Sequence, residues 1–448
     1  MAKGNGNKKQ AAANGSEKPL PAYFKSLTIE NVKCFRGKHT IDLSDGKGKP
    51  AQWTVILGNN NTGKTTILKC LAGLEPIDYF TNARPMEGQQ EESFLAPYIA
   101  QTSFPDEFYT KNLDFKITSE IFFCGNLSFN LLNGVYSTLG NFFWGKDEVG
   151  FPLDSPLRLA GLKFYSYGAS RKMSKKPLSE SQDLRLHSSL FDNEEITNVE
   201  DWLLNLFLAK QLKQEQAKPI LELAKEVLAS GILPDVQEVD LDSSKKGTGF
   251  ENYVKFKTDF GWIRFRHLGY GYQTMIAWVL DLVKRMVERY PGSPNPLAEP
   301  AIVLVDEIDL HLHPDWQRRI ISHLTKYFPN TQFIVTAHSP LIVQSAEEIN
   351  LVILKKEGES VHIEQPKIRT FRGWTVEEIL TDLMALEGQT MSQTYLDLMQ
   401  QFDDALDADD YEKAEAAYGE LDKILHPNSH QRKLLQLQMT SLSPADAV

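Results

Sequence analysis

The chain has 448 residues, of which 42% are hydrophobic and 24% are charged, and its formal net charge is −11 at pH 7. This composition is typical of an ordinary folded protein and excludes a chain that is disordered throughout. The acidic balance argues against a protein that coats nucleic acid over its whole surface, although a local basic groove could still bind DNA.

The expected compartment follows from what the sequence lacks. No apolar run approaches the roughly 20 residues that span a bilayer, and the polar segment 1–22 lacks the apolar core of a signal peptide. Its lysines, set among Gly, Asn and Ala, predict a disordered basic tail. Cys34, Cys70 and Cys124 have no paired spacing, so we expect neither a disulfide framework nor a zinc site. We therefore expect a cytoplasmic protein that does not contact a membrane.

Residues 23–165 are predicted to form the first lobe of an α/β core. Alternating apolar residues indicate strands that pair as a hairpin, and a short apolar run that breaks at a glycine indicates a buried strand before a loop. The expected elements are a β-hairpin over 23–43 with Gly37 in its turn, a strand over 53–57, a helix over 65–72 closed by Gly73, and a strand over 115–123.

An inserted lobe of helices and strands is predicted over residues 166–265. Asn198, followed by two acidic residues and an apolar series at helical spacing, indicates a capped amphipathic helix. A second helix is expected to end at Gly231 as its C-cap, and residues 254–265 return to strand character. Asp259-Phe260-Gly261 is interpreted as a hairpin turn, because no other kinase motif accompanies it.

The core is predicted to resume over residues 266–354, and a C-terminal helical region is expected over 355–448. The expected elements are a helix over 273–289, buried strands over 302–305 and 333–335, a helix over 316–328 and a helical hairpin that ends near Leu425. The hairpin carries an acidic run from Asp403 to Glu415. This run is either a solvated surface or a dock for a basic partner.

A phosphate-binding loop lies between the predicted buried strand and its helix. The segment Gly58-Asn59-Asn60-Asn61-Thr62-Gly63-Lys64-Thr65 matches G-x-x-x-x-G-K-[ST] in full. The glycines let the backbone wrap round a β-phosphate, and the helix N-terminus, including Thr66, faces the anion. Lys64 is predicted to neutralise the β/γ oxygens and the Thr65 hydroxyl to ligate Mg²⁺. ATP and Mg²⁺ are therefore the expected ligands.

Two later strands end in polar residues that suit ATP hydrolysis. Asp306 and Glu307 end an apolar strand: Asp306 is predicted to hold Mg²⁺ through its water shell, and Glu307 to activate the attacking water as general base. His338 follows the next apolar strand and is predicted to sense the γ-phosphate. Alone, such a histidine is more often an ordinary hydrogen-bonded residue. The order of the three motifs along the chain favours the catalytic role.

Residues 267–273 lie between a strand and a helix and resemble the ABC signature loop. In that family this loop caps the γ-phosphate of ATP held by the opposing subunit, which assigns Leu268, Gly269 and Gly271 to nucleotide binding in trans. Gly269 stands where a serine is usual and Tyr270 where a small residue is usual. A plain glycine turn is the alternative.

Two histidine-containing strings suggest metal sites, and we favour other interpretations. Asp309, His311 and His313 directly follow the Asp-Glu pair, in the place of the D-loop that crosses the dimer interface of ABC ATPases. The string from His426 to His430 lacks the ββα context of a metal-binding nuclease, so we interpret it as a helix cap after Pro427.

With these motifs the chain resembles the ABC/SMC-related ATPases, a group that includes RecF-like, Rad50-like and OLD-family proteins. The likeness covers residues 23–354 and implies an α/β fold: a P-loop ABC-type ATPase core, with a mixed sheet flanked by helices, an inserted short helical lobe and a C-terminal helical hairpin. Softer motifs are similar to the PtuA family of ATPase subunits from Septu-type anti-phage systems. These are Tyr167–Arg171, Leu190–Asp192, Trp202–Leu204 and Gly269–Gln273.

The resemblance implies an ATPase that forms a homodimer or higher homo-oligomer through shared ATP sites and regulates a separate HNH nuclease. Trp374 and the acidic run are candidate contacts for that partner. No intrinsic nuclease is expected: the segment beyond Leu354 is too short for a Toprim domain, and Asp403, Asp404 and Asp407 lie on a predicted helix. The alternatives are a DNA-repair ATPase of the RecF/Rad50 kind and a transporter nucleotide-binding subunit, which the aromatic insertion, the helical lobe and the C-terminal hairpin disfavour.

Overall fold

The computed structural model describes residues 21–74, 76–79, 94–97, 115–123, 127–136, 142–144, 164–178, 188–191, 195–233, 235–384 and 391–442. The chain divides into two compact units, Met1–Trp374 and Thr375–Val448. The expectations for the tail, Cys124 and Asp192 fall outside the described residues, apart from the last two positions of the tail. Within the described ranges, no helix is long and apolar enough to cross a membrane.

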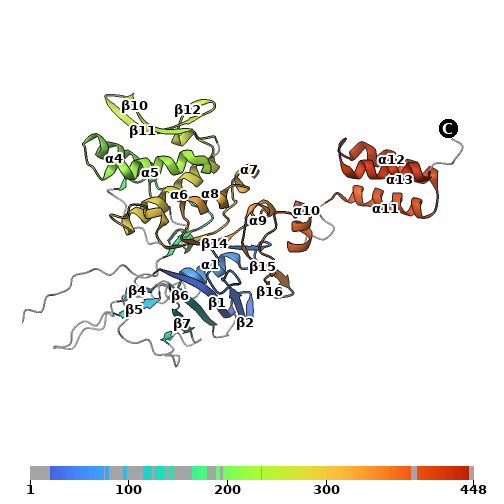
Figure 1. Ribbon diagram of the computed structural model, residues 1–448, viewed down its shortest axis with the longest axis horizontal. Helices are drawn as coiled ribbons and strands as arrows, with labels where there is room; N and C mark the ends of the chain where they lie inside the picture. Colours follow the sequence, from blue (N-terminus) through green and yellow to red (C-terminus); the bar gives the residue numbers. More distant parts are fainter. Residues whose placement is uncertain are drawn as a thin grey trace, which may run out of the picture. The chain divides into compact units, whose positions relative to one another are not determined.

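A six-stranded sheet forms the centre of the first unit (Figure 1). Its strands, in spatial order, are β16 (Ser360–Glu364), β15 (Asn350–Glu357), β3 (Trp53–Gly58), β14 (Thr331–Thr336), β13 (Ala301–Val305) and β9 (Phe164–Tyr167). All neighbours are parallel except β16, which is antiparallel to β15. The three inner strands β3, β14 and β13 are buried along their whole length, which explains their continuous apolar sequences. The segments that follow these three strands therefore meet at one edge of the sheet.

A five-stranded antiparallel sheet packs against this centre. Its strands, in spatial order, are β2 (Phe35–Asp42), β1 (Ala22–Val32), β6 (Phe115–Phe123), β7 (Leu127–Tyr136) and β8 (Phe142–Trp144). Helix α1 (Lys64–Ala72) shares one buried apolar cluster with both sheets, through residues such as Ile67 and Leu71. The predicted hairpin is confirmed, but its turn lies at Lys33 and Cys34. Gly37 instead lies within β2, where its N–H donates to Asn31 Oδ1 at 2.9 Å.

The predicted inserted lobe contains helices and a small antiparallel sheet. These are α4 (Val199–Gln211), α5 (Ala217–Val227), β10 (Glu238–Lys246), β11 (Gly249–Thr258) and β12 (Gly261–Arg264). Asn198 caps α4 by accepting from the Asp201 N–H, as predicted, and Gly231, with φ of 99°, ends the turn after α5. Residues 254–265 form two strands, joined by the predicted hairpin turn at Asp259 and Phe260.

Several boundaries differ from the sequence-based predictions. Helix α6 (Tyr270–Arg289) begins three residues earlier than expected. The single helix expected over 316–328 is two helices, α7 (Pro314–Gln317) and α8 (Ile320–Tyr327), which are separated at Arg319, where φ is −115°. The central sheet includes β9 and β15, so the boundaries placed at residues 165 and 354 fall within strands.

The remaining α-helices and β-strands that the structure describes in the first unit are short. They are β4 (Pro76–Tyr79) paired with β5 (Phe94–Pro97), α3 (Ser188–Phe191) and α9 (Pro340–Ser345).

The second unit is helical. It contains α10 (Val376–Glu378), α11 (Gln393–Asp407), α12 (Tyr411–Ile424) and α13 (His430–Leu442). The predicted helical hairpin is confirmed as α11 and α12, and α13 adds Leu435 and Met439 to their buried cluster. The hydroxyl of Ser429 accepts from the Arg432 N–H at the start of α13, so the cap expected in this segment is a serine.

Candidate active site

Gly58 and Gly63 give the loop after β3 its tight path. A Cβ on Gly58 would lie 2.6 Å from the Thr62 hydroxyl and 2.9 Å from the Leu354 carbonyl oxygen. On Gly63, where φ is 89°, it would lie 2.7 Å from Cys34 Sγ. No other side chain fits at either position without displacing its surroundings. The loop therefore leads directly into the N-terminus of α1, which favours anions.

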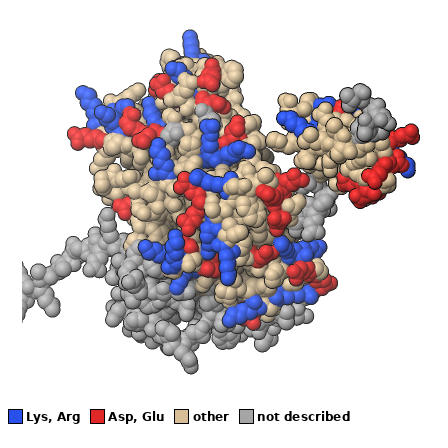
Figure 2. Space-filling model, turned by 45° about the vertical axis from the view of Figure 1, so that its right-hand side comes forward, with Lys and Arg blue, Asp and Glu red and all other residues tan. Residues whose placement is uncertain are grey.

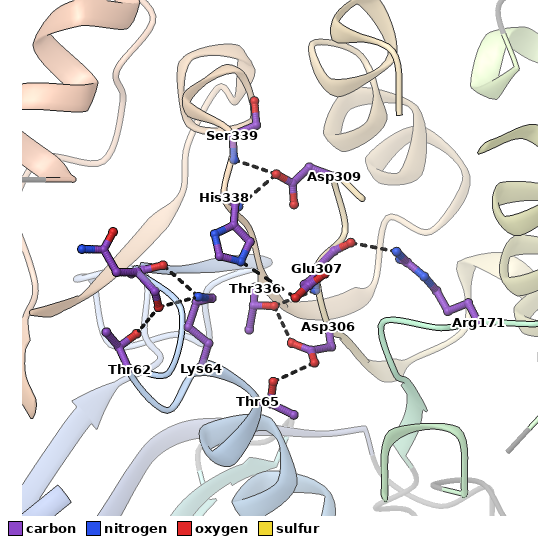
Figure 3. Close-up of polar contacts among 12 residues, drawn as sticks. Thr62, Lys64, Thr65, Arg171, Asp306, Glu307, Asp309, Thr336, His338 and Ser339 are labelled. Carbon is purple, nitrogen blue, oxygen red and sulfur yellow. Dashed lines mark hydrogen bonds and ion pairs between the residues drawn. The ribbon is translucent and has the colours of Figure 1, made fainter. Parts of the chain in front are cut away.

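Lys64 lies inside this loop. Its Nζ donates to the carbonyls of Gly58 at 2.8 Å and Asn59 at 2.9 Å (Figure 3), and the Thr62 hydroxyl donates to the same Asn59 carbonyl at 2.8 Å. Burial lowers the pKa of Lys64, and the carboxylates of Asp306 and Glu307 oppose that shift. The loop thus holds a buried cation next to the acidic strand end.

Asp306 joins the loop to two strand ends. Its Oδ2 accepts from the Thr65 hydroxyl at 2.7 Å and its Oδ1 from the Thr336 hydroxyl at 2.6 Å. The Thr336 hydroxyl in turn accepts from the Glu307 N–H at 2.6 Å. Hydroxyl and carboxylate oxygens are the ligands that Mg²⁺ prefers, and the close approach of Thr65 and Asp306 fits such a site.

Glu307 adopts a strained conformation beside His338. Its φ is 50°, a left-handed value that costs a residue other than Gly or Asn about 1–3 kcal/mol. The Glu307 and His338 side chains point toward one another (Figure 3), and Oε1 lies 3.9 Å from Nε2. Each side chain is about one-third exposed, so both can meet a ligand. Strain of this kind is concentrated at functional sites.

Asp309 fixes the segment that carries His338. Its Oδ2 accepts from the main-chain N–H of His338 at 2.9 Å and of Ser339 at 2.6 Å. The Ser339 hydroxyl donates to Gln317 Oε1 at 2.6 Å, which connects the same segment to α7. Asp309 therefore acts as a structural acceptor for this backbone, a role that the sequence analysis missed.

Asp309, His311 and His313 do not come together as a metal-binding group in the structure. The His311 ring packs edge-on against Tyr270, with centroids 4.9 Å apart, and the His313 side chain caps α7. Across the part of the chain that the structure describes, no group of His, Cys, Asp and Glu could hold a metal ion through three or more ligands.

Arg171 was noted in the sequence only as part of a soft motif. It is 2% exposed, and its Nη2 donates to the Glu307 carbonyl at 2.7 Å (Figure 3). Burial lowers the pKa of Arg171 to about 10, opposed by the carboxylates of Asp306, Asp309 and Glu307. The guanidinium is therefore still a cation at neutral pH. Beyond that motif nothing in the sequence marks this contact, because its target lies 136 residues away.

The residues assigned to the signature lie at the start of α6. The Leu268 carbonyl accepts from Gln273 Nε2 at 2.8 Å, and Gly269 is the N-cap. A Cβ on Gly271 would lie 2.3 Å from the His311 carbonyl oxygen of the same chain. Gly271 is therefore needed for α6 to approach the segment after Glu307. The structure brings the P-loop, Asp306, Glu307 and His338 together and places the signature residues against that neighbouring segment.

Comparisons with known proteins agree with these motifs. Residues 53–344 match the family model described as "AAA domain, putative AbiEii toxin, Type IV TA system", and residues 26–74 match a second model described as "AAA domain". The chain is 28% identical over 423 residues to Septu protein PtuA from Bacillus thuringiensis, which covers 93% of this chain and 97% of that protein.

Two further likenesses cover a smaller share of this chain. Over 149 residues the chain is 36% identical to a protein named "Retron Ec83 probable ATPase" from Escherichia coli, which is 33% of this chain and 27% of that protein. The chain also resembles a solved structure from Pyrococcus furiosus, an Smc head domain with an extended coiled coil bound to the C-terminal domain of ScpA. The alignment covers 81% of this chain and 99% of the chain in that structure. The sequence identity is 13% and the TM-score 0.46.

Proposed function

Because the matched segment 53–344 is more than half of the sequence, the chain belongs to this AAA family, as an ABC/SMC-like P-loop ATPase related to Septu protein PtuA, and we propose that it hydrolyses Mg-ATP to control a separate nuclease in anti-phage defence. The observation that carries the ATPase part is the hydrogen-bonded series Thr65, Asp306, Thr336, Glu307. It joins a phosphate-binding loop to a candidate general base across three separate elements.

The residues of this series, together with Lys64 and His338, each have a role in the proposed reaction. Lys64 neutralises the β/γ oxygens of ATP, and Glu307 takes the proton of the attacking water. His338, next to Glu307, contacts the γ-phosphate. Thr65 and Asp306 would hold Mg²⁺, which neutralises charge on the phosphate oxygens when bound. Thr336 fixes Asp306 relative to Glu307, so that the base is aligned before the substrate binds.

Two substitutions test the ATPase part. Lys64→Ala should abolish ATP binding, because it removes a buried cation from the phosphate loop. Glu307→Gln should bind a fluorescent ATP analogue at parental affinity but lose hydrolysis, since the amide keeps the shape and cannot take the proton. Hydrolysis by Glu307→Gln at the parental rate would contradict the assignment of the base.

We further propose that ATP sites are completed between copies of the chain, with the N-terminus of α6 facing the nucleotide of the partner. Gly269 is suited to testing this, because a Cβ there meets only Tyr272, at 3.7 Å. In Gly271→Asp, by contrast, the new side chain would collide with the His311 carbonyl of its own chain. A loss of activity in that variant would therefore not report on the nucleotide of the partner alone. Gly269→Asp and Lys64→Ala chains should each be inactive and regain activity when mixed. Mixed dimers that form but stay inactive would contradict shared sites.

The proposal of a separate nuclease, of HNH type, rests on the likeness to PtuA and on the charge of the second unit. Helices α11 and α12 carry eight carboxylates and two lysines, and Asp409 and Asp410 between them add two more carboxylates, which suits a basic partner. Removing residues 392–425 alone would expose Leu435 and Met439 of α13, so the cleaner test is truncation after Trp374. The truncated chain should bind ATP but lose the nuclease in a pull-down. DNA cleavage by the full chain alone, unchanged by Glu307→Gln, would contradict the two-protein proposal.

A further inference from the structure

We infer that Arg171 is a positioning residue for ATP hydrolysis, which holds the main chain of Glu307 in its left-handed conformation and so fixes the direction of the Glu307 carboxylate. The inference rests on the proposed role of Glu307 as the general base. It starts from the hydrogen bond that Arg171 Nη2 donates to the Glu307 carbonyl at 2.7 Å.

Both residues of this hydrogen bond have left-handed backbones. The φ of Arg171 is 35° and that of Glu307 is 50°, and neither side chain favours such values. The surrounding contacts must therefore hold them in place. The Glu307 N–H donates to the Thr336 hydroxyl at 2.6 Å, while its carbonyl accepts from Arg171. The next residue, Ile308, donates its N–H to the Thr336 carbonyl at 2.9 Å. Thr336 thus holds one side of the Glu307 peptide, and Arg171 holds the other together with the Leu310 N–H, which donates to the same Glu307 carbonyl at 2.9 Å.

The loop that carries Arg171 is anchored close to the strand of Glu307. Strand β9 pairs with β13 up to the partners Tyr167 and Val305, and the Asp306 N–H donates to the Tyr167 carbonyl at 2.8 Å. Gly168 then packs so closely that a Cβ would lie 2.2 Å from the Ser189 carbonyl oxygen. Arg171 follows three residues later. Its guanidinium therefore extends from a fixed base and can hold another backbone in place.

The burial of Arg171 is not explained by a structural role alone. At 2% exposure, its Nε and Nη1 have no hydrogen-bond partner among the residues that the structure describes. A buried cation with unsatisfied nitrogens is a weak source of stability, and a neutral side chain would be easier to bury. Its described hydrogen bond goes to Glu307, and the charge lies beside the carboxylates of Asp306 and Asp309. Both observations connect Arg171 to the candidate base.

Steady-state kinetics of Arg171→Gln test the inference. The kcat for ATP should fall roughly 10- to 100-fold, because a misdirected base loses the geometry of proton transfer, while KM and the affinity for a fluorescent ATP analogue stay within about twofold. Adding Arg171→Gln to Glu307→Gln should lower kcat no further, since Arg171 acts through Glu307. Arg285→Gln is the matched control. Arg285 is a partly buried arginine, paired with the buried Asp281 at 2.6 Å, and its loss should lower Tm and leave the kcat of folded protein unchanged.

Three results would overturn the inference: parental kcat in folded Arg171→Gln, a loss confined to KM, or a further fall in the double variant. If Arg171→Gln does not fold, Arg171→Lys decides the question. Arg171→Lys keeps the positive charge but changes the geometry of the hydrogen-bond donors, so kcat should fall several-fold at unchanged KM. Parental kcat in this variant would contradict the inference. A wild-type chain without ATPase activity would instead contradict the proposed function, so the two failures can be told apart.

Discussion

The two units of the chain bury different kinds of side chain. In the first unit Lys64, Arg171, Asp306 and Asp309 are each at most 7% exposed and lie around one strand edge. In the described part of the second unit, only apolar residues are buried, while carboxylates gather on its surface (Figure 2). Buried charges cost stability and are kept where they do chemistry, whereas surface charges cost little and suit recognition. Substitutions in the first unit should therefore change catalysis, and those in the second should change partner binding.

The largest effect is expected at the glycine that precedes Lys64. In Gly63→Ala the new methyl group would lie 2.7 Å from Cys34 Sγ at a φ of 89°, so the P-loop must shift. Affinity for ATP should fall roughly 100-fold or more, measured by equilibrium binding. Gly292→Ala is the matched control: φ there is +80° and no atom lies within 4 Å, so it should lower stability by about 1 kcal/mol and leave ATP binding intact. Equal ATP affinities of the two variants would contradict a steric requirement at Gly63.

The next effect compares two threonines of strand β14. Thr336→Val removes the hydroxyl that joins Asp306 to Glu307, so kcat should fall roughly 10- to 100-fold and the free energy of unfolding by about 1–3 kcal/mol. Thr331 is also buried, but its hydroxyl has no hydrogen-bond partner among the described residues. Thr331→Val should therefore keep or raise Tm at unchanged kcat. A loss of activity in both variants would show that β14 is merely sensitive to valine.

The sequence predicted local features of the site well. The P-loop, the Asp306-Glu307 strand end and the position of His338 all depend on short motifs at strand ends, and the parallel sheet brings them to one edge. The helix cap at Asn198 was likewise predictable, because its partner lies three residues away. In each case the residues that determine the feature are neighbours in the chain.

The supporting contacts could not be predicted in this way. Arg171 reaches Glu307 across 136 residues, and Asp309 accepts from backbone N–H groups about thirty residues away, with no local pattern to mark either contact. The break of the predicted helix over 316–328 at Arg319, where φ is −115°, likewise has no marker in the apolar pattern of the segment. Gly271 shows the same limit: the sequence indicated a nucleotide contact, and the structure adds a close approach to His311.

A smaller effect, confined to the partner, is expected from the acidic surface of the second unit. Replacing Asp403, Asp404 and Asp407 by Asn should weaken binding of a basic partner about tenfold and make that binding less sensitive to salt concentration. The ATPase activity should stay parental. Co-purified nuclease measured across a salt series would show this. Glu347→Gln with Glu348→Gln, two acidic residues of the first unit, is the control and should leave the partner bound. Equal losses from both sets would mean that only overall charge matters.

The smallest effect tests whether the two units unfold separately. Ser392 caps α11 by accepting from the Tyr395 N–H, and Asn198 caps α4 in the first unit in the same way. Each alanine substitution should remove about 1 kcal/mol, since one N–H at the helix start loses its acceptor. Because each unit has its own buried cluster, the loss should stay within the unit that carries the substitution. Amide hydrogen exchange should therefore speed up in α11 to α13 for Ser392→Ala, and in α4 and its neighbours for Asn198→Ala. Faster exchange in both units from either substitution would show that they unfold as one, and catalysis and partner binding could then no longer be varied independently.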